Sequence, residues 1–186
     1  MLILASTSPR RAELIAMLGV PFEVVPSEVD ETPLPGEPPG KLAARLARAK
    51  ATASAVGRAP DDVVVGADTI VVVDGDALGK PIDAADASRM LRRLSGRSHE
   101  VITAVALAHA GGIEEFLERT IVTFATMGHA EIDRYVAGGE PLDKAGAYGI
   151  QGSGGRWITQ IEGSYHNVVG LPLAQLATRL AAIDDA

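Results

Sequence analysis

The chain contains few lysines, and three of them stand where a cation could meet a compact anion. Thirteen arginines and four lysines supply the positive charge of its 186 residues. Lys50 follows an arginine-bearing stretch with helical periodicity, Lys80 sits in LGKP, and Lys144 sits in DKAGAYGIQG, while Arg10 and Arg11 open an expected helix. Cations at glycine-rich turns and a helix start, in a protein that is acidic overall, favour the binding of a phosphate chain.

The expected helix start lies in Ser6-Thr7-Ser8-Pro9-Arg10-Arg11, directly after an apolar run. A helix N-terminus offers unpaired N–H groups and a partial positive charge, both of which suit phosphate. The arginines add planar donors that can bind phosphate through two hydrogen bonds. Ser6, Ser8, Arg10 and Arg11 are therefore candidate substrate-binding residues, although ordinary helix capping beside two solvated arginines would explain them as well.

Asp68 interrupts the most apolar stretch of the chain, VVVGADTIVVV. Burying an aspartate in a strand is costly unless it is paired or bound to a metal, and aspartate is a poor strand former. A conflict of this kind between local sequence and structure is typical of functional sites. We therefore expect Asp68 to be functional, the alternative being a structural aspartate at a β-bulge.

Three further segments are less specific by themselves. The acidic pair Asp30-Glu31 could solvate a loop or supply a magnesium ligand, since magnesium prefers carboxylate and phosphate oxygens. Lys80 stands between a glycine and a proline, as many surface turns do. The glycine-rich residues 146–155 could form a flexible loop, but Gln151 within them has both a donor and an acceptor, as recognition of a base edge requires.

Composition excludes several classes of protein. The net charge of −7 and the pI near 5.1 argue against a nucleic-acid backbone as the main partner. The absence of cysteine excludes disulfides and thiol catalysis, and the four histidines lack metal-site spacing. The apolar runs are too short to span a membrane, and the N-terminal arginines follow the apolar stretch, the reverse of a signal peptide. We therefore expect a cytoplasmic protein. The sequence contains neither a P-loop nor a GxGxxG motif, so it gives no support to the common nucleotide-binding folds.

Helices and strands alternate along the chain without a strict β-α-β period, which predicts an α/β fold on a mixed sheet. The expected strands are residues 2–5, 22–25, 63–73, 100–108, 116–125 and 157–161, and the expected helices are residues 9–18, 40–57, 83–94, 131–136 and 173–183. We expect 100–108 and 116–125 to be antiparallel neighbours. The proline-rich residues 30–40 should form an exposed loop.

In this order, the segments closely resemble the Maf family of nucleoside triphosphate pyrophosphatases. The matching stretches are LASTSPRRAELI, VDET, ARAKA, GADTIVVVDGDALGKP, MLRRLSGRSHEVITAV, EPLDKAGAYGIQGSGG and IEGSYHNVVGLPL, which together span almost the whole chain. The resemblance implies a single domain over residues 1–186. It implies an elongated α/β structure similar to inosine triphosphatases, in which helices flank a mixed sheet and two lobes surround a central cleft.

The resemblance also implies a reaction, the hydrolysis of a nucleoside triphosphate to the monophosphate and pyrophosphate. The implied cofactor is a divalent cation, magnesium with manganese or cobalt as alternatives. Asp68 matches the family's catalytic base. Glu31, Lys50 and Lys80 match charged residues of the active cleft, so that Lys50 and Lys80 join Asp68 as catalytic residues. Glu31 and Asp68 are the metal-ligand candidates.

Three positions match the branch of the family that selects dTTP and UTP: Arg10, Thr69 and Gln151. A sister branch that prefers 7-methyl-GTP carries tryptophan, glutamine and glutamate there. Lys144, in the same glycine-rich stretch as Gln151, joins the substrate-binding candidates, and the resemblance implies a homodimer. Two alternatives stay open: a broad-range pyrophosphatase that removes non-standard nucleotides, and a nucleotide-binding regulator of cell division and septum formation.

Overall fold

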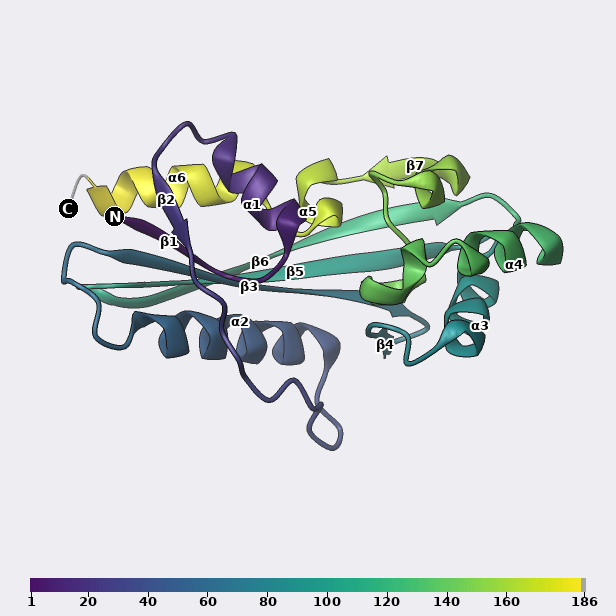
Figure 1. The fold of residues 1–186 in the computed structure, drawn as a ribbon, viewed down its shortest axis with the longest axis horizontal. Coiled ribbons are helices and arrows are strands. Elements are labelled where there is room, and N and C mark those ends of the chain that lie inside the picture. Colours follow the sequence, from purple (N-terminus) through teal and green to yellow (C-terminus); the bar gives the residue numbers. More distant parts are fainter. Residues whose placement is uncertain (185–186) are drawn as a thin grey trace. The chain divides into compact units, whose positions relative to one another are not determined.

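A computed structural model describes residues 1–184 of the chain (Figure 1). The strands are β1 (Leu2–Ala5), β2 (Phe22–Val24), β3 (Val63–Val73), β4 (Asp76–Leu78), β5 (Ser98–His109), β6 (Gly112–Phe124) and β7 (Ile158–Glu162). The α-helices are α1 (Pro9–Ala16), α2 (Pro39–Ala55), α3 (Ala84–Leu94), α4 (His129–Ala137), α5 (Tyr165–Val169) and α6 (Leu173–Asp184). Short 3-10 helices are η1 (Glu140–Asp143), η2 (Ala145–Ala147) and η3 (Ser153–Trp157).

The strands form one mixed sheet in the order β2-β1-β3-β5-β6-β7, with β4 paired to β3. β1 runs parallel to β2 and β3, whereas β4 is antiparallel to β3 and β7 is antiparallel to β6. β5 and β6 are neighbours joined by two residues, a connection that only antiparallel strands allow. The predicted α/β class, the mixed sheet and the antiparallel neighbours are confirmed.

The chain packs as two compact units. Unit 1 contains residues 1–68, 103–118 and those from Gly170 onward, and unit 2 contains residues 69–102 and 119–169. The strands β3, β5 and β6 contribute residues to both. A single domain over residues 1–186 stays a prediction, and it extends two residues beyond the described part of the chain.

In unit 1, α2 covers one face of the sheet, while α1 and α6 cover the other (Figure 1). Apolar residues at helical spacing account for this placement. Leu42 and Leu46 are buried on α2, Leu14 and Ile15 on α1, and Leu176 on α6. The helices expected at residues 9–18, 40–57 and 173–183 are confirmed, with ends that differ by up to two residues.

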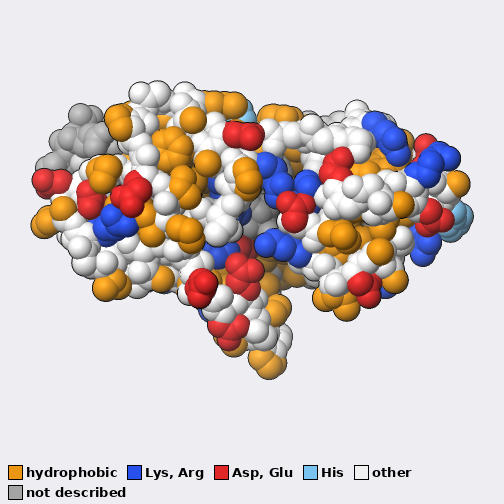
Figure 2. All heavy atoms as spheres, in the orientation of Figure 1, with side chains coloured by type: hydrophobic (Ala, Val, Ile, Leu, Met, Phe, Trp, Pro, Cys, Tyr) orange, Lys and Arg blue, Asp and Glu red, His pale blue; other side chains and the backbone are white. Residues whose placement is uncertain are grey.

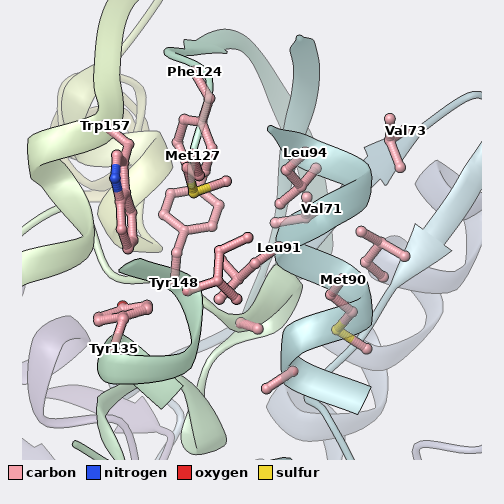
Figure 3. Close-up of a cluster of buried hydrophobic side chains, with 14 of the residues drawn as sticks. Val71, Val73, Met90, Leu91, Leu94, Phe124, Met127, Tyr135, Tyr148 and Trp157 are labelled. Atoms are coloured by element: carbon pink, nitrogen blue, oxygen red, sulfur yellow. The ribbon is translucent and has the colours of Figure 1, made fainter. Parts of the chain in front are cut away.

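Unit 2 has an aromatic-rich core in which α3 packs against α4. Leu91 and Leu94 of α3 face Tyr135 of α4, Phe124 and Trp157 (Figure 3). Large aromatic side chains contribute much buried area, so this core fixes the irregular backbone that surrounds it.

Some predicted boundaries were wrong. β5 and β6 begin earlier than expected, at Ser98 and Gly112, because hairpin pairing overrides the low strand preference of glycine and charged residues there. Residues 165–169 form α5, which was not among the expected helices, and the buried Asn167 side chain donates to the Val101 carbonyl and to Thr120 Oγ1. Trp157 ends η3 instead of opening β7.

Lys and Arg side chains lie among Asp and Glu side chains on the face shown in Figure 2. Several form surface ion pairs, including Arg48 with Glu115 and Arg93 with Asp76. Among residues 1–184, no helix combines the length and apolarity needed to cross a membrane.

Candidate active site

The register between β1 and β3 brings two site-bearing segments to one end of the sheet. The strands are parallel, with Leu4 opposite Val65 and Ala5 opposite Gly66. β1 ends at Ala5, whereas β3 continues past Asp68. The segment that begins at Ser6 therefore leaves the sheet near Asp68, at the carboxyl end where open parallel sheets commonly bind ligands.

Gly66 brings α2 close to β3. A Cβ atom at Gly66 would lie 2.5 Å from the Ala51 backbone nitrogen and 2.9 Å from Ala51 Cβ. Only glycine therefore permits this approach. Residues two apart in a strand point to the same face, so Asp68 faces α2 as Gly66 does.

Lys50 projects from α2 and joins two carboxylates. Its Nζ atom lies 2.7 Å from Asp68 Oδ1 and 2.7 Å from Glu31 Oε1. Lys50 is only 8% exposed and Asp68 only 9%. Buried charges need close partners of opposite sign, and this pair provides them. The predicted candidates Glu31, Lys50 and Asp68 thus meet in unit 1.

The proline-rich loop that carries Glu31 is fastened to α2. Arg45 donates two hydrogen bonds to the Glu37 carboxylate, at 2.7 and 2.8 Å, and a third to the Thr32 carbonyl at 3.0 Å. The bonds from Arg45, together with one from the Leu34 N–H, lower the pKa of Glu37 to about 2. Asp30 accepts from the Thr32 backbone N–H at 2.9 Å. Asp30 therefore shapes the turn, while Glu31 reaches Lys50.

Arg11 completes the cluster from the first turns of α1. Its Nε donates to the Gly170 carbonyl at 2.9 Å, and its Nη1 donates to Ser6 Oγ at 3.3 Å. Ser8 is the N-cap residue of α1, yet its side chain forms no cap bond within the described residues. Ser6 Oγ instead accepts from the Ser8 N–H at 3.1 Å. Arg10, at the same helix start, is half-buried.

We call Arg11, Glu31, Lys50 and Asp68 the Asp68 cluster. Desolvation raises the pKa of Asp68 above its ordinary value, against the opposing pull of Lys50 and Arg11. Desolvation also lowers the pKa of Arg11, although a guanidinium stays protonated at any physiological pH. A buried carboxylate with a raised pKa can accept a proton. The two cations beside it can bind an anion.

The remaining predicted site residues belong to unit 2. Thr69 follows Asp68 in β3 and is half-buried, while Lys80 is exposed after β4. The Gly79 carbonyl accepts from the Gly146 N–H at 3.0 Å. Gly146 has a left-handed backbone with φ of 69° and packs on Val71, where a Cβ would lie 2.9 Å from Cγ2. The structure thus ties the Lys80 turn to the glycine-rich stretch.

Lys144 is bound within its own neighbourhood. Its Nζ donates to the Glu140 carbonyl at 2.6 Å and to Asp143 Oδ1 at 2.5 Å. Gln151 is exposed within the turn that follows Gly149. Lys144 therefore shapes the backbone around this turn, whereas the Gln151 side chain is accessible to a ligand.

Sequence reasoning assigned no role to Gly66 or Glu140. A lone glycine in a strand indicates a close backbone approach, so the signal for Gly66 was present. Glu140 accepts hydrogen bonds from residues 13 and 14 positions further along the chain. No local pattern predicts contacts of that kind.

The carboxylates of the Asp68 cluster could hold a metal together with a ligand. Within residues 1–184, no three His, Asp or Glu side chains gather as a ready metal site. Glu31 and Asp68 provide two carboxylates around one point, now bridged by Lys50. Magnesium commonly binds one or two carboxylates plus substrate phosphates, so the residues present fit such an ion.

The chain is similar to known proteins over nearly its whole length. A dTTP/UTP pyrophosphatase of Anaeromyxobacter dehalogenans is 56% identical over 183 residues, which cover 96% of this chain and 92% of the relative. Another, of Shigella sonnei, is 54% identical over 174 residues, which cover 94% and 88%. The structure of the Staphylococcus aureus Ham1 protein covers 97% of this chain and 98% of its own, with a TM-score of 0.56 and 16% identity, and it shares the fold.

The family resemblance extends over nearly the full sequence. The Maf-like protein family matches residues 1–183. That range includes every residue of the Asp68 cluster as well as Lys80 and Gln151. The chain therefore belongs to the Maf-like protein family.

Proposed function

We propose that the protein hydrolyses dTTP and UTP to the nucleoside monophosphate and pyrophosphate. The observation that carries this proposal is the buried Asp68 carboxylate, which lies 2.7 Å from the Lys50 ammonium and within electrostatic reach of Arg11. The relatives named dTTP/UTP pyrophosphatase support the substrate.

In the proposed reaction, a water molecule attacks the α-phosphorus. Its oxygen forms a bond to phosphorus, the bond from phosphorus to the bridging oxygen of pyrophosphate breaks, and the water proton passes to Asp68. A base with a raised pKa is suited to this task, because its affinity for the proton is closer to what neutral pH requires. Lys50 and Arg11 stabilise negative charge on the phosphate oxygens.

A divalent cation is the proposed cofactor, magnesium with manganese or cobalt as alternatives. Glu31 and Asp68 would hold it, and Lys50 would then turn from one carboxylate towards the substrate. When bound, the ion neutralises phosphate charge in the bound nucleotide. Removal of divalent cations with a chelator should therefore abolish turnover, and added magnesium should restore it.

The roles of residues in unit 2 rest on the family resemblance. We propose that Lys80 contacts the phosphates and that Arg10, Thr69 and Gln151 determine selectivity. A pyrimidine such as thymine presents a carbonyl–imide–carbonyl edge, which the amide of Gln151 can match with both donor and acceptor. A wrong base would leave polar groups that the bound nucleotide covers without partners, which makes this form of selectivity effective.

We also propose a cytoplasmic homodimer. The dimer rests on the family resemblance, and the compartment rests on the substrate, because nucleoside triphosphates are cytoplasmic metabolites. Size measurement in solution tests the first part, and localisation of a tagged chain tests the second.

The test is pyrophosphate release with magnesium from dTTP, UTP, CTP, GTP, ATP and 7-methyl-GTP, with Asp68→Asn as the control. Turnover that is confined to dTTP and UTP and depends on Asp68 is the expected result. Turnover spread over many bases would favour a broad-range pyrophosphatase. Tight nucleotide binding without turnover would favour a regulator of cell division.

A further inference from the structure

We propose that Glu140 is a positioning residue for base selection. Its carboxylate holds residues 149–154, here called the Gln151 segment, in the conformation that presents Gln151 to the base. The inference rests on the proposed function, because it requires Gln151 to contact the base.

Both carboxylate oxygens of Glu140 are occupied by donors from the core and from the Gln151 segment. Oε2 accepts from the Ser153 N–H at 3.0 Å and from Ser153 Oγ at 2.5 Å. Oε1 accepts from the Tyr135 hydroxyl at 2.9 Å and from the Gly154 N–H at 3.4 Å. One side chain thus links α4 to the far end of the segment.

Tyr135 fastens the near end of the same segment. Its hydroxyl donates to Glu140 and accepts from the Gly149 N–H at 3.3 Å. Tyr135 is 5% exposed, and its ring packs edge-on against Trp157, with the centroids 5.0 Å apart (Figure 3). The hydroxyl is therefore fixed by the core, and Tyr135 and Glu140 together hold the segment on both sides of Gln151.

The glycines of the segment make room for this arrangement. A Cβ at Gly152 would overlap the Glu140 carboxylate, and one at Gly154 would lie 2.6 Å from the Tyr135 hydroxyl. Glycine-rich backbone has high conformational entropy in the absence of such contacts. The side chains that hold the segment therefore supply order that its own sequence does not.

The charge states keep these bonds in place near neutral pH. Partial burial of Glu140 opposes ionisation, but the bonds from Ser153, Tyr135 and Gly154 lower its pKa overall. Burial, together with the bond to Glu140, raises the pKa of Tyr135. An ionised acceptor therefore faces a protonated phenol, and hydrogen bonds to a charged group are stronger than neutral ones.

A segment that is ordered in advance loses less entropy when the base binds. Without Glu140, part of the binding free energy would be used to order residues 149–154. A base that Gln151 does not recognise gains nothing from this order, so its hydrolysis should change little. Loss of Glu140 should then raise KM for dTTP and reduce selectivity, while kcat at saturation stays close to that of the wild type.

The experiment compares the full-length wild type with Glu140→Ala and Tyr135→Phe. Tyr135→Phe keeps the ring that packs on Trp157 and removes only the hydroxyl, so it tests the inference even if Glu140→Ala fails to fold. Glu162→Ala is the matched control, because Glu162 is an exposed carboxylate of the same unit that accepts from Gln160. The readouts are kcat and KM for dTTP and CTP, and amide hydrogen exchange at Gly149, Ser153 and Gly154.

We expect Glu140→Ala to raise KM for dTTP about tenfold or more, since several hydrogen bonds to a charged group are lost together. The dTTP-to-CTP ratio of kcat/KM should fall by a similar factor, the three amides should exchange faster, and Glu162→Ala should match the wild type. Unchanged KM and ratio in folded variants, beside a selective wild type, would overturn this inference and leave the proposed function standing. A wild type without dTTP turnover would overturn both.

Discussion

The Asp68 cluster and the Gln151 segment are positioned by opposite means. The cluster is built on regular elements, with Asp68 in a buried strand and Lys50 on a helix that crosses that strand at Gly66. The segment has irregular backbone, with a turn and a 3-10 helix, and it is held by side chains from outside. Packing fixes the first, whereas hydrogen bonds fix the second.

This difference suits the two proposed tasks. Proton transfer needs a carboxylate held within a fraction of an ångström, which rigid elements provide. Base recognition needs a polar side chain that can be replaced by another without moving the catalytic residues. A side chain on a glycine-rich surface turn meets this need. Substitutions in the Gln151 segment should therefore change the preference for one base over another without changing the rate of the chemical step.

The largest effect outside Asp68 itself should come from Lys50→Ala. Removing this cation takes the ammonium partner from the buried Asp68 carboxylate and from the exposed Glu31 carboxylate. The loss of one preorganised charge typically lowers kcat about a hundredfold. Lys50 holds down the pKa of Asp68, so its removal should raise that pKa further. Asp68 acts in its ionised form, so the acid limb of the kcat/KM profile should move to higher pH.

The matched control for this change is Lys41→Ala, an exposed lysine on the same helix. Pyrophosphate release from dTTP between pH 5 and pH 9 measures both variants. An acid limb that stays at its wild-type position in Lys50→Ala would show that Lys50 does not act on the ionisation of Asp68.

A second effect should appear in the stability of the protein at acid pH, through His99 in unit 2. His99 is buried against Phe124 and Tyr148, its Nε2 lies 2.8 Å from the Tyr148 hydroxyl, and burial lowers its pKa to about 4. Between pH 6.5 and 4 the unfolded chain therefore binds a proton at His99 that the folded chain does not. The free energy of unfolding should fall by about 3 kcal/mol across this range through His99 alone.

Urea unfolding at several pH values measures this dependence. In His99→Gln, the free energy of unfolding should decrease much less between pH 6.5 and pH 4. In His129→Gln, which changes an exposed histidine, it should decrease as in the wild type. The same pH dependence in wild type and His99→Gln would show that other groups cause the acid sensitivity.

A third effect should appear where α2 crosses β3. Gly66→Ala forces α2 away from the strand, and overpacking of this kind costs about 1–3 kcal/mol of unfolding free energy. The shift also separates Lys50 from Asp68, so kcat should fall as well. Gly79→Ala is the control for stability, because a Cβ there meets no atom within 4 Å. Equal stabilities of the two variants would contradict the close approach.

The sequence predicted the Asp68 cluster more fully than the Gln151 segment, for physical reasons. An aspartate in a run of valines conflicts with local expectation, and such a conflict is visible without a structure. Lys50 and Glu31 were assigned to the site by the family resemblance. β3 was predicted with the bounds that the structure has. The joining of Lys50 to Asp68 and Glu31 was not predicted, because it depends on how α2 crosses β3.

Residues 140–157 could not be predicted in the same way. Five glycines and a proline give no periodicity from which to infer the 3-10 helices. The role of Glu140 depends on donors from α4 and from η3, which only tertiary packing brings together. Lys144 looked like a free cation in the sequence, yet its ammonium binds Asp143 and the Glu140 carbonyl.

The most direct test compares Asp68→Asn with Gln151→Glu on dTTP and GTP. Asp68→Asn should lower kcat/KM for both nucleotides by one common factor, on the order of a hundredfold to ten-thousandfold, because it removes the proposed base. Gln151→Glu should instead lower the ratio of kcat/KM for dTTP to kcat/KM for GTP, while the slower hydrolysis of GTP stays unchanged. Near-wild-type turnover by folded Asp68→Asn, or an unchanged ratio in Gln151→Glu, would contradict this division between chemistry and base selection.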